Sequence, residues 1–144
     1  MKPKIFLLIA ACCAFFIYGC EKEKAVPAEE LPQTAQEFIA AHFSGASIAS
    51  VVKEKDRNTS YDVVLSNGFS LDFNKEGECT EIKGNGLQLP ASVVPLKVGE
   101  YIQTNYVNDF IVGWEKEGAN TDFDLSSHIE LRFDNEGNFL SRED

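Results

Sequence analysis

Residues 61–73 read YDVVLSNGFSLDF, in which apolar and polar residues alternate on both sides of Asn67-Gly68. This pattern is typical of a β-hairpin with Asn67-Gly68 at its tip. A two-residue loop would put the apolar residues of the two strands on opposite faces. A three-residue loop beginning at Ser66 pairs Leu65 with Phe69 and puts all of them on one face. We therefore expect the three-residue loop, with Gly68 in the left-handed region of φ.

The same pattern returns about 60 residues later, a spacing longer than one solenoid repeat. Residues 121–133 read TDFDLSSHIELRF, so we expect Leu125 opposite Ile129 and His128 at the position of Gly68. Each hairpin pattern follows a helix-like run, residues 31–43 and 94–106, with apolar residues spaced three and four apart. The predicted fold class is α+β, a tandem duplication. Residues 31–86 and 87–144 each form one helix packed on a four-stranded antiparallel sheet.

The first residues of the chain indicate export. Lys2 and Lys4 precede an apolar run, residues 5–17, that is too short to span a bilayer but typical of a signal peptide. The run ends in Tyr18-Gly19-Cys20 and resembles a bacterial lipoprotein signal, in which residues 1–19 are removed and Cys20 carries the lipid. Residues 20–30 would then be a charged tether. We expect a lipid-anchored protein of the cell envelope, facing the periplasm or the cell surface; an uncleaved anchor or an ordinary secretory signal is the alternative.

The charge of the chain excludes one class of partner. Removal of residues 1–19 leaves 11 basic and 23 acidic residues, a net charge of −12. Binding of nucleic acid depends on Lys and Arg that neutralise phosphates, so no nucleic-acid partner is expected. A basic partner or a cation is compatible with this charge, and so is a surface that only keeps the protein soluble.

Few residues of this chain are candidates for chemistry. Cys79 falls on the apolar face of its predicted strand, and we expect a small buried hydrophobic residue there. His42 and His128 lie at non-equivalent positions of the two repeats, and we expect structural roles for both. The segment from Asp56 is similar to the start of a calcium-binding loop but lacks the glutamate at its twelfth position. No metal and no cofactor are expected.

The polar face of the predicted sheet carries acidic residues. The register places Asp62 opposite Asp72 and Asp124 opposite Glu130, whereas Asp122 lies opposite Arg132. Like charges directly opposite each other are destabilising. The face is therefore either a hydrated surface or an acidic surface that binds a basic protein or peptide, or a cation. The four acids Asp62, Asp72, Asp124 and Glu130 are the candidate binding residues.

Trp114 is the fifth candidate. Its segment, Phe110-Ile-Val-Gly-Trp114, is apolar at alternate and at adjacent positions, so its strand phase cannot be decided. Trp114 is either buried between the halves or an exposed anchor for a partner.

One motif of the chain is similar to a known family. It consists of Leu31-Pro32, Phe38-Ile39 and Tyr61-Asp-Val-x-Leu-x-Asn-Gly-x-x-Leu-x-Phe-x-x-x-Gly77, and a looser second copy follows it. It resembles the PepSY-like, β-lactamase-inhibitor-like lipoproteins of Bacteroides and related bacteria. The resemblance covers residues 31–144 and implies a duplicated α+β fold in the cell envelope with no catalytic motif. The second copy departs from the pattern at Thr121 and at Ser127-His128.

These observations favour a non-catalytic, lipid-anchored envelope module that binds a protein or peptide through the polar sheet face. Carboxylates on an open face are expected to be too well solvated for acid–base catalysis. Two alternatives stay open: a structural or sensory envelope protein without a dedicated ligand site, and a true inhibitor of proteases or β-lactamases.

Overall fold

The computed structural model describes residues 23–54 and 60–143, and these form one antiparallel sheet of nine strands with two α-helices. The strands follow one another across the sheet in the order in which they occur in the chain. The helices are α1 (Gln33–His42) and α2 (Leu96–Asn105), and short 3-10 turns cover Ala28–Glu30 and Ala91–Val93. The strands are β1 (Glu23–Ala25), β2 (Ile48–Glu54), β3 (Ser60–Leu65), β4 (Ser70–Asn74), β5 (Cys79–Lys83), β6 (Ile111–Glu117), β7 (Asn120–Leu125), β8 (Glu130–Asp134) and β9 (Phe139–Glu143).

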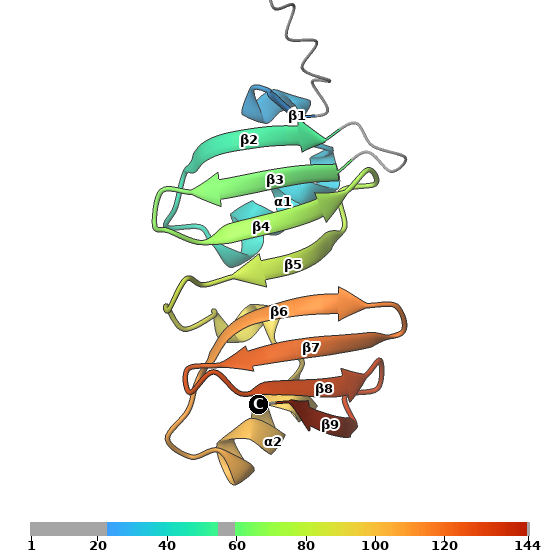
Figure 1. The fold of residues 1–144 in the computed structure, drawn as a ribbon. Coiled ribbons are helices and arrows are strands. Elements are labelled where there is room, and N and C mark those ends of the chain that lie inside the picture. Colours follow the sequence, from blue (N-terminus) through green and yellow to red (C-terminus); the bar gives the residue numbers. More distant parts are fainter. Residues whose placement is uncertain (1–22, 55–59, 144) are drawn as a thin grey trace, which may run out of the picture.

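The order of elements in β2–β5 with α1 is repeated in β6–β9 with α2 (Figure 1). The sheet is continuous between these two parts because β5 pairs with β6, where Ile82 lies opposite Trp114. Trp114 in turn lies opposite Phe123 on β7, and cross-strand partners share a face of the sheet. The apolar row therefore passes from one part to the other without changing face.

Both hairpins have the expected register. The Leu65 N–H donates to the Phe69 carbonyl at 2.8 Å, and Val63 lies opposite Leu71. In the second hairpin the Leu125 N–H donates to the Ile129 carbonyl at 2.9 Å. Gly68 has φ +96° and His128 has φ +66°, so both turns use the left-handed conformation that the three-residue loop requires.

One hydrophobic core lies between the helices and one face of the sheet. Phe73, Phe123 and Phe133 are at most 2% exposed, and burial of such a side chain stabilises the fold by about 2–3 kcal/mol. Phe38 of α1 meets Phe73 edge-on at 5.9 Å, and Tyr101 of α2 meets Phe133 edge-on at 5.4 Å. Both helices therefore cover the same face, and no helix among the described residues lies on the opposite face. We call that opposite surface the open face.

Both helices begin where the sequence predicts, because Pro32 and Pro95 are their N-cap residues. Proline suits this position since its missing N–H has no partner within the helix. Ile39 and Ile102 occupy the centres of the two apolar stripes and are buried.

The segment expected to be a charged tether is partly structured. Glu23–Ala25 forms β1 and pairs with β2, with Glu23 opposite Glu54. Without β1, the outer edge of β2 would have backbone N–H and C=O groups without partners. An extended segment can form hydrogen bonds with these groups whatever its side chains are. The predicted signal, Cys20 and the segment from Asp56 lie outside the described residues.

Cys79 is 6% exposed and lies opposite Phe73, which confirms the prediction of a buried position. Burial raises the pKa of its thiol to about 12. Phe139 takes the corresponding place opposite Phe133 but is 38% exposed, because β9 is the edge of the sheet.

Candidate functional site

Five carboxylates cross the open face in a single row. They come from five adjacent strands, β3 to β7, and each lies directly opposite the next. We call this set the acidic row: Asp62, Asp72, Glu81, Glu115 and Asp122. Adjacent strands are about 4.8 Å apart, so neighbouring side chains in the row are close enough to repel one another.

Arg132 on β8 ends the row and neutralises its last member. Its guanidinium donates two hydrogen bonds to the Asp122 carboxylate, Nε to Oδ1 at 2.7 Å and Nη2 to Oδ2 at 2.5 Å. Asp122 is 7% exposed, and this bidentate pairing offsets the cost of burying its charge. The hydrogen bonds to Asp122 also raise the pKa of Arg132.

Asp72 occupies the position in the first part that Arg132 occupies in the second. Partial burial raises the pKa of Asp72 to about 7, and a side-chain hydrogen bond with Glu81 and the charge of Asp62 add to the increase. Burial and the charges of Glu54 and Glu23 raise the pKa of Asp62 as well. Among the described residues, no Lys or Arg forms an ion pair with Asp62 or Asp72.

This result corrects one expectation from the sequence. We expected carboxylates on the open face to be too well solvated for a shifted pKa, but neighbouring strands crowd Asp72 enough to remove part of its hydration. Similar crowding raises the pKa of Glu115, of Asp124 and of Glu130, in each case first through partial burial and then through nearby acids.

Lys83 lies beside the row on β5. Its Nζ is 2.8 Å from Glu81 Oε1, and this contact raises the pKa of the lysine. The charge of Lys83 also lowers the pKa of Asp62, Asp72 and Asp124. It does not cancel the increases that burial and nearby acids cause in these three pKa values, because its ammonium group is held by Glu81.

All four acids predicted from the sequence lie on the open face. Asp62 faces Asp72, and Asp124 faces Glu130 in the next row of the sheet. Sequence reasoning missed Glu81 and Glu115, which connect the two parts of the row. The signal for Glu115 was its position next to Trp114, because an inward tryptophan implies an outward glutamate.

The structure corrects the prediction that Trp114 is a candidate binding residue. It is 8% exposed and lies on the helix-covered face between Ile82 and Phe123. With so little of its surface exposed, the indole cannot be an exposed anchor. The alternative that Trp114 is buried between the halves is the correct one.

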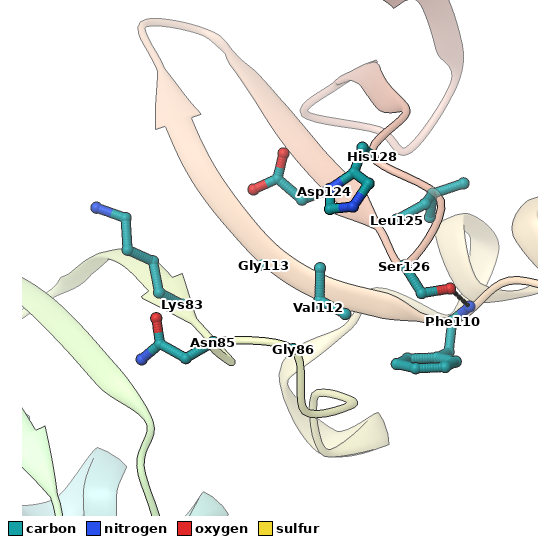
Figure 2. A pocket seen from close by; sticks show the side chains of 10 residues that line it. All are labelled: Lys83, Asn85, Gly86, Phe110, Val112, Gly113, Asp124, Leu125, Ser126 and His128. Carbon is teal, nitrogen blue, oxygen red and sulfur yellow. Dashed lines mark hydrogen bonds between the residues drawn. The ribbon is translucent and has the colours of Figure 1, made fainter. Parts of the chain in front are cut away.

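A hollow of about 500 Å³ opens where β5 meets β6 and β7, and we call it the seam pocket (Figure 2). Its floor is Gly113, which lies between Lys83 and Asp124 in one cross-strand row. The turn after β5 forms one wall and the β7–β8 turn forms the other. The lining residues are Lys83, Asn85, Gly86, Phe110, Val112, Gly113, Asp124, Leu125, Ser126 and His128.

The described residues contain neither a candidate metal site nor a membrane-spanning helix. No group of three or more His, Cys, Asp or Glu side chains in residues 23–54 and 60–143 is arranged to hold a metal ion. Within the same ranges, no helix has the length and apolar character needed to span a membrane.

Comparison with known proteins identifies the family. Residues 19–69 and 59–141 match the family model described as "Putative beta-lactamase-inhibitor-like, PepSY-like". A crystallised "putative periplasmic protein" of Bacteroides vulgatus ATCC 8482 is similar, with 33% identity, a TM-score of 0.80, and coverage of 88% of this chain and 100% of that one. A "putative calcium-regulated periplasmic protein" of Bacteroides thetaiotaomicron has 29% identity and a TM-score of 0.82 over the same shares of the two chains.

No curated protein matches the chain significantly. The two matches to the family model together cover most of the described residues. The alignments with the two similar structures cover 100% of each crystallised chain. The chain belongs to the PepSY-like, β-lactamase-inhibitor-like family.

Proposed function

We propose that the protein is a non-catalytic module of the bacterial envelope that binds a basic protein or peptide through its open face. The observation that carries this proposal is the acidic row, in which five carboxylates meet across five strands and only Asp122 has an arginine partner among the described residues.

The row favours a cationic partner for a physical reason. Asp62 lies opposite Asp72, and the raised pKa of Asp72 reflects first its lost hydration, then its hydrogen bond with Glu81 and the repulsion by Asp62. A cationic group placed over them would relieve the repulsion, which a neutral or anionic ligand cannot do. The same field would also accelerate the encounter with a basic partner.

The extended surface is consistent with duplication of one unit. In this proposal, residues 31–86 and 87–144 derive from one helix and a four-stranded sheet, and joining of the copies at β5 and β6 doubles the width of the open face. The matching order of elements and the equivalent turns at Gly68 and His128 support this origin.

The proposal includes lipid anchoring through Cys20 after removal of residues 1–19. The similar structures from Bacteroides are described as periplasmic, which agrees with export. Labelling of cells with an alkyne fatty acid should mark the wild-type protein, and Cys20→Ser should abolish both the label and the membrane fraction. Retention of the label in that variant would contradict the anchor site.

Absence of catalysis is also part of the proposal. Asp72 has a pKa suited to proton transfer, but it lies on an open row beside other acids. Among the described residues, no group of His, Cys, Asp or Glu side chains beside it is arranged to hold a metal ion. Inhibition of a protease or β-lactamase is a special case of partner binding, and the family description is the observation that favours it. A stoichiometric loss of enzyme activity on titration would establish that case.

Capture of partners from a native envelope extract tests the proposal. The bait is the chain from residue 21; the crystallised relatives match 88% of this chain, which indicates that this part folds alone. The first variant carries Asp62→Asn, Asp72→Asn, Glu81→Gln and Glu115→Gln. The matched control carries Glu29→Gln, Glu37→Gln, Glu76→Gln and Glu100→Gln, which remove the same charge from exposed sites outside the row.

A basic protein retained by the wild type and the control but lost by the row variant is the expected result. Equal retention by all three baits would contradict the site. If no bait retains a specific protein, the structural or sensory alternative is favoured. Repetition of the capture with calcium and with a chelator would test whether calcium matters here, as the name of one relative says for that protein.

A further inference from the structure

The seam pocket exists because β6 has a glycine at its centre. A Cβ atom on Gly113 would lie 2.8 Å from Asp124 Oδ2 and 3.2 Å from the Ile82 carbonyl oxygen. The equivalent strand in the first part, β2, has Ser50 at this position, opposite Val64. Glycine inside a strand often marks the close approach of another group, and here it leaves the hollow on the open face.

The acid in this pocket has no partner of its own. Among the described residues, no hydrogen bond or ion pair is formed by the Asp124 carboxylate. The two nearby cations are engaged elsewhere, because Lys83 contacts Glu81 and Arg132 contacts Asp122. Partial burial raises the pKa of Asp124, the charges of Glu81 and Asp122 add to the increase, and Lys83 lowers it without cancelling the increase. A cation bound at Asp124 would therefore be attracted by Asp124, Glu81 and Asp122, while the charge of Lys83, which also lines the pocket, is offset by its contact with Glu81.

The opposite end of the pocket is apolar. Phe110 is 37% exposed, and Val112 is half-buried beside it. Figure 2 shows the Phe110 ring at one end of the hollow, Lys83 at the opposite end, and the Asp124 carboxylate between them beside His128. Ser126 fixes this end, since its Oγ accepts a hydrogen bond from the Phe110 N–H at 3.3 Å and donates one to Asp109 at 3.0 Å.

The walls of the pocket are held by hydrogen bonds to backbone carbonyls, of which the one from Asn85 is donated by its side-chain Nδ2. The Gly84 N–H donates to the Val112 carbonyl at 2.6 Å, and the Asn85 amide donates to the Gly68 carbonyl at 2.8 Å. On the other side, the His128 N–H donates to the Leu125 carbonyl at 2.9 Å. The hollow is thus formed before a ligand arrives, which lowers the entropic cost of binding.

An apolar wall that leads to an unpaired carboxylate matches a long cationic side chain. Arg and Lys both place an apolar stem against hydrophobic surface and a charged head in a polar site. We infer that the seam pocket holds one arginine or lysine side chain of the basic partner, with the stem against Phe110 and Val112 and the charged head at Asp124. This inference rests on the proposed function and identifies where on the open face the partner is anchored.

Blocked pentapeptides of sequence Ala-Ala-X-Ala-Ala, with X as arginine, lysine or the neutral isostere citrulline, test the pocket. Binding is followed by amide chemical shifts of the chain from residue 21. We expect the arginine or the lysine peptide to give saturable shifts at Gly113, Asp124 and His128, and the citrulline peptide to give none. Which cationic peptide binds more tightly identifies the preferred head group.

Asp124→Asn should weaken binding of the cationic peptide about tenfold or more, since a charge-assisted contact is lost. Gly113→Ala should weaken it by filling the floor, and Ser50→Ala, at the equivalent position of β2, is the matched control that should leave it unchanged. Equal shifts from citrulline, or an unchanged affinity in Asp124→Asn, would overturn the inference.

The two proposals can fail separately. A partner captured by the wild type, lost by the row variant and retained by Asp124→Asn would leave the proposed function standing and overturn the pocket. Pentapeptide binding that depends on Asp124, without any captured partner, would support the pocket and count against a basic protein partner in the extract used.

Discussion

The same pair of sheet positions carries opposite chemistry in the two parts of the molecule. In β3 and β4, Asp62 lies opposite Asp72, whereas in β7 and β8, Asp122 lies opposite Arg132. The second pair satisfies its own charge within the fold, and the first leaves two crowded carboxylates with raised pKa values. The backbone therefore does not require an acid at Asp72, since the equivalent residue of the second part is Arg132. In our proposal, this difference leaves the first pair available to a partner.

A second comparison concerns the last strands of the two parts. Ile82 on β5 lies opposite Leu71, and Arg142 on β9 lies opposite Leu131. The inner strand β5 needs an apolar residue there, because β6 covers it, while the edge strand β9 carries a charged one. A charge at this position discourages further strands from adding to the edge.

The largest expected effect comes from giving the second part the acid pair of the first. Arg132→Asp would leave Asp122, which is 7% exposed, beside a like charge instead of its arginine. Loss of one partner of a buried pair is strongly destabilising, so we expect Tm at pH 8 to fall by about 10 °C or more. Circular dichroism melting measures this change. The reciprocal variant, Asp72→Arg, should raise Tm, and equal effects of both variants would contradict the comparison.

Asp72→Asn should stabilise the protein in a pH-dependent way. The pKa of Asp72 is about 7 in the folded protein against 3.8 for the free group, so the folded state binds a proton that the unfolded state releases between these values. Stability of the wild type should therefore fall as pH rises from 4 to 7. Because Asp72 keeps part of its hydration, we expect the variant to gain only about 1 kcal/mol at pH 8 and nothing at pH 4.

Urea unfolding at the two pH values measures that difference. Asp134→Asn is a useful control, since hydrogen bonds from Asn138 lower the pKa of Asp134 and its replacement should not stabilise the protein at pH 8. An equal gain for Asp72→Asn at both pH values would contradict the explanation.

The turns of the two hairpins provide a smaller contrast. Gly68→Ala introduces a side chain at φ +96° and should cost about 1 kcal/mol of unfolding free energy. His128→Gly removes a side chain at φ +66° and should be neutral or stabilising by a few tenths of a kcal/mol. Chemical denaturation distinguishes these values. Destabilisation by His128→Gly would indicate that the imidazole makes contacts that support the turn.

The smallest perturbation probes Cys79 without a mutation. Its burial beneath Phe73 and a thiol pKa of about 12 should make alkylation by iodoacetamide at pH 8 about 100-fold slower in the folded protein than in urea. Mass spectrometry follows the reaction. Similar rates in both states would show that the core beside β5 opens readily.

The local elements could be predicted from the sequence because face and register are linked. A one-residue slip between Val63 and Leu71 would move a whole apolar set into water, so the pattern allowed one hairpin register. Helix starts at Pro32 and Pro95 were readable for a similar local reason.

Long-range features could not be predicted. Pairing of β5 with β6 joins residues about 30 positions apart in the chain. No local sequence pattern predicts which two strands will pair over such a separation. Without that pairing, the phase of Trp114 stayed open, and Glu81 and Glu115 could not be added to the row. The pairing of β1 with β2 was not predicted, because the charged residues of β1 show no apolar pattern and the strand is held by backbone contacts.

The most direct test of the open face as the binding surface is amide chemical-shift mapping with a blocked hexalysine peptide at pH 7.5 and low salt. We predict saturable shifts concentrated on β3–β7, at Asp62, Asp72, Glu81 and Glu115, that are lost in the row variant and kept in the matched control. Shifts spread evenly over α1, α2 and the sheet, or shifts that persist in the row variant, would contradict the proposed function.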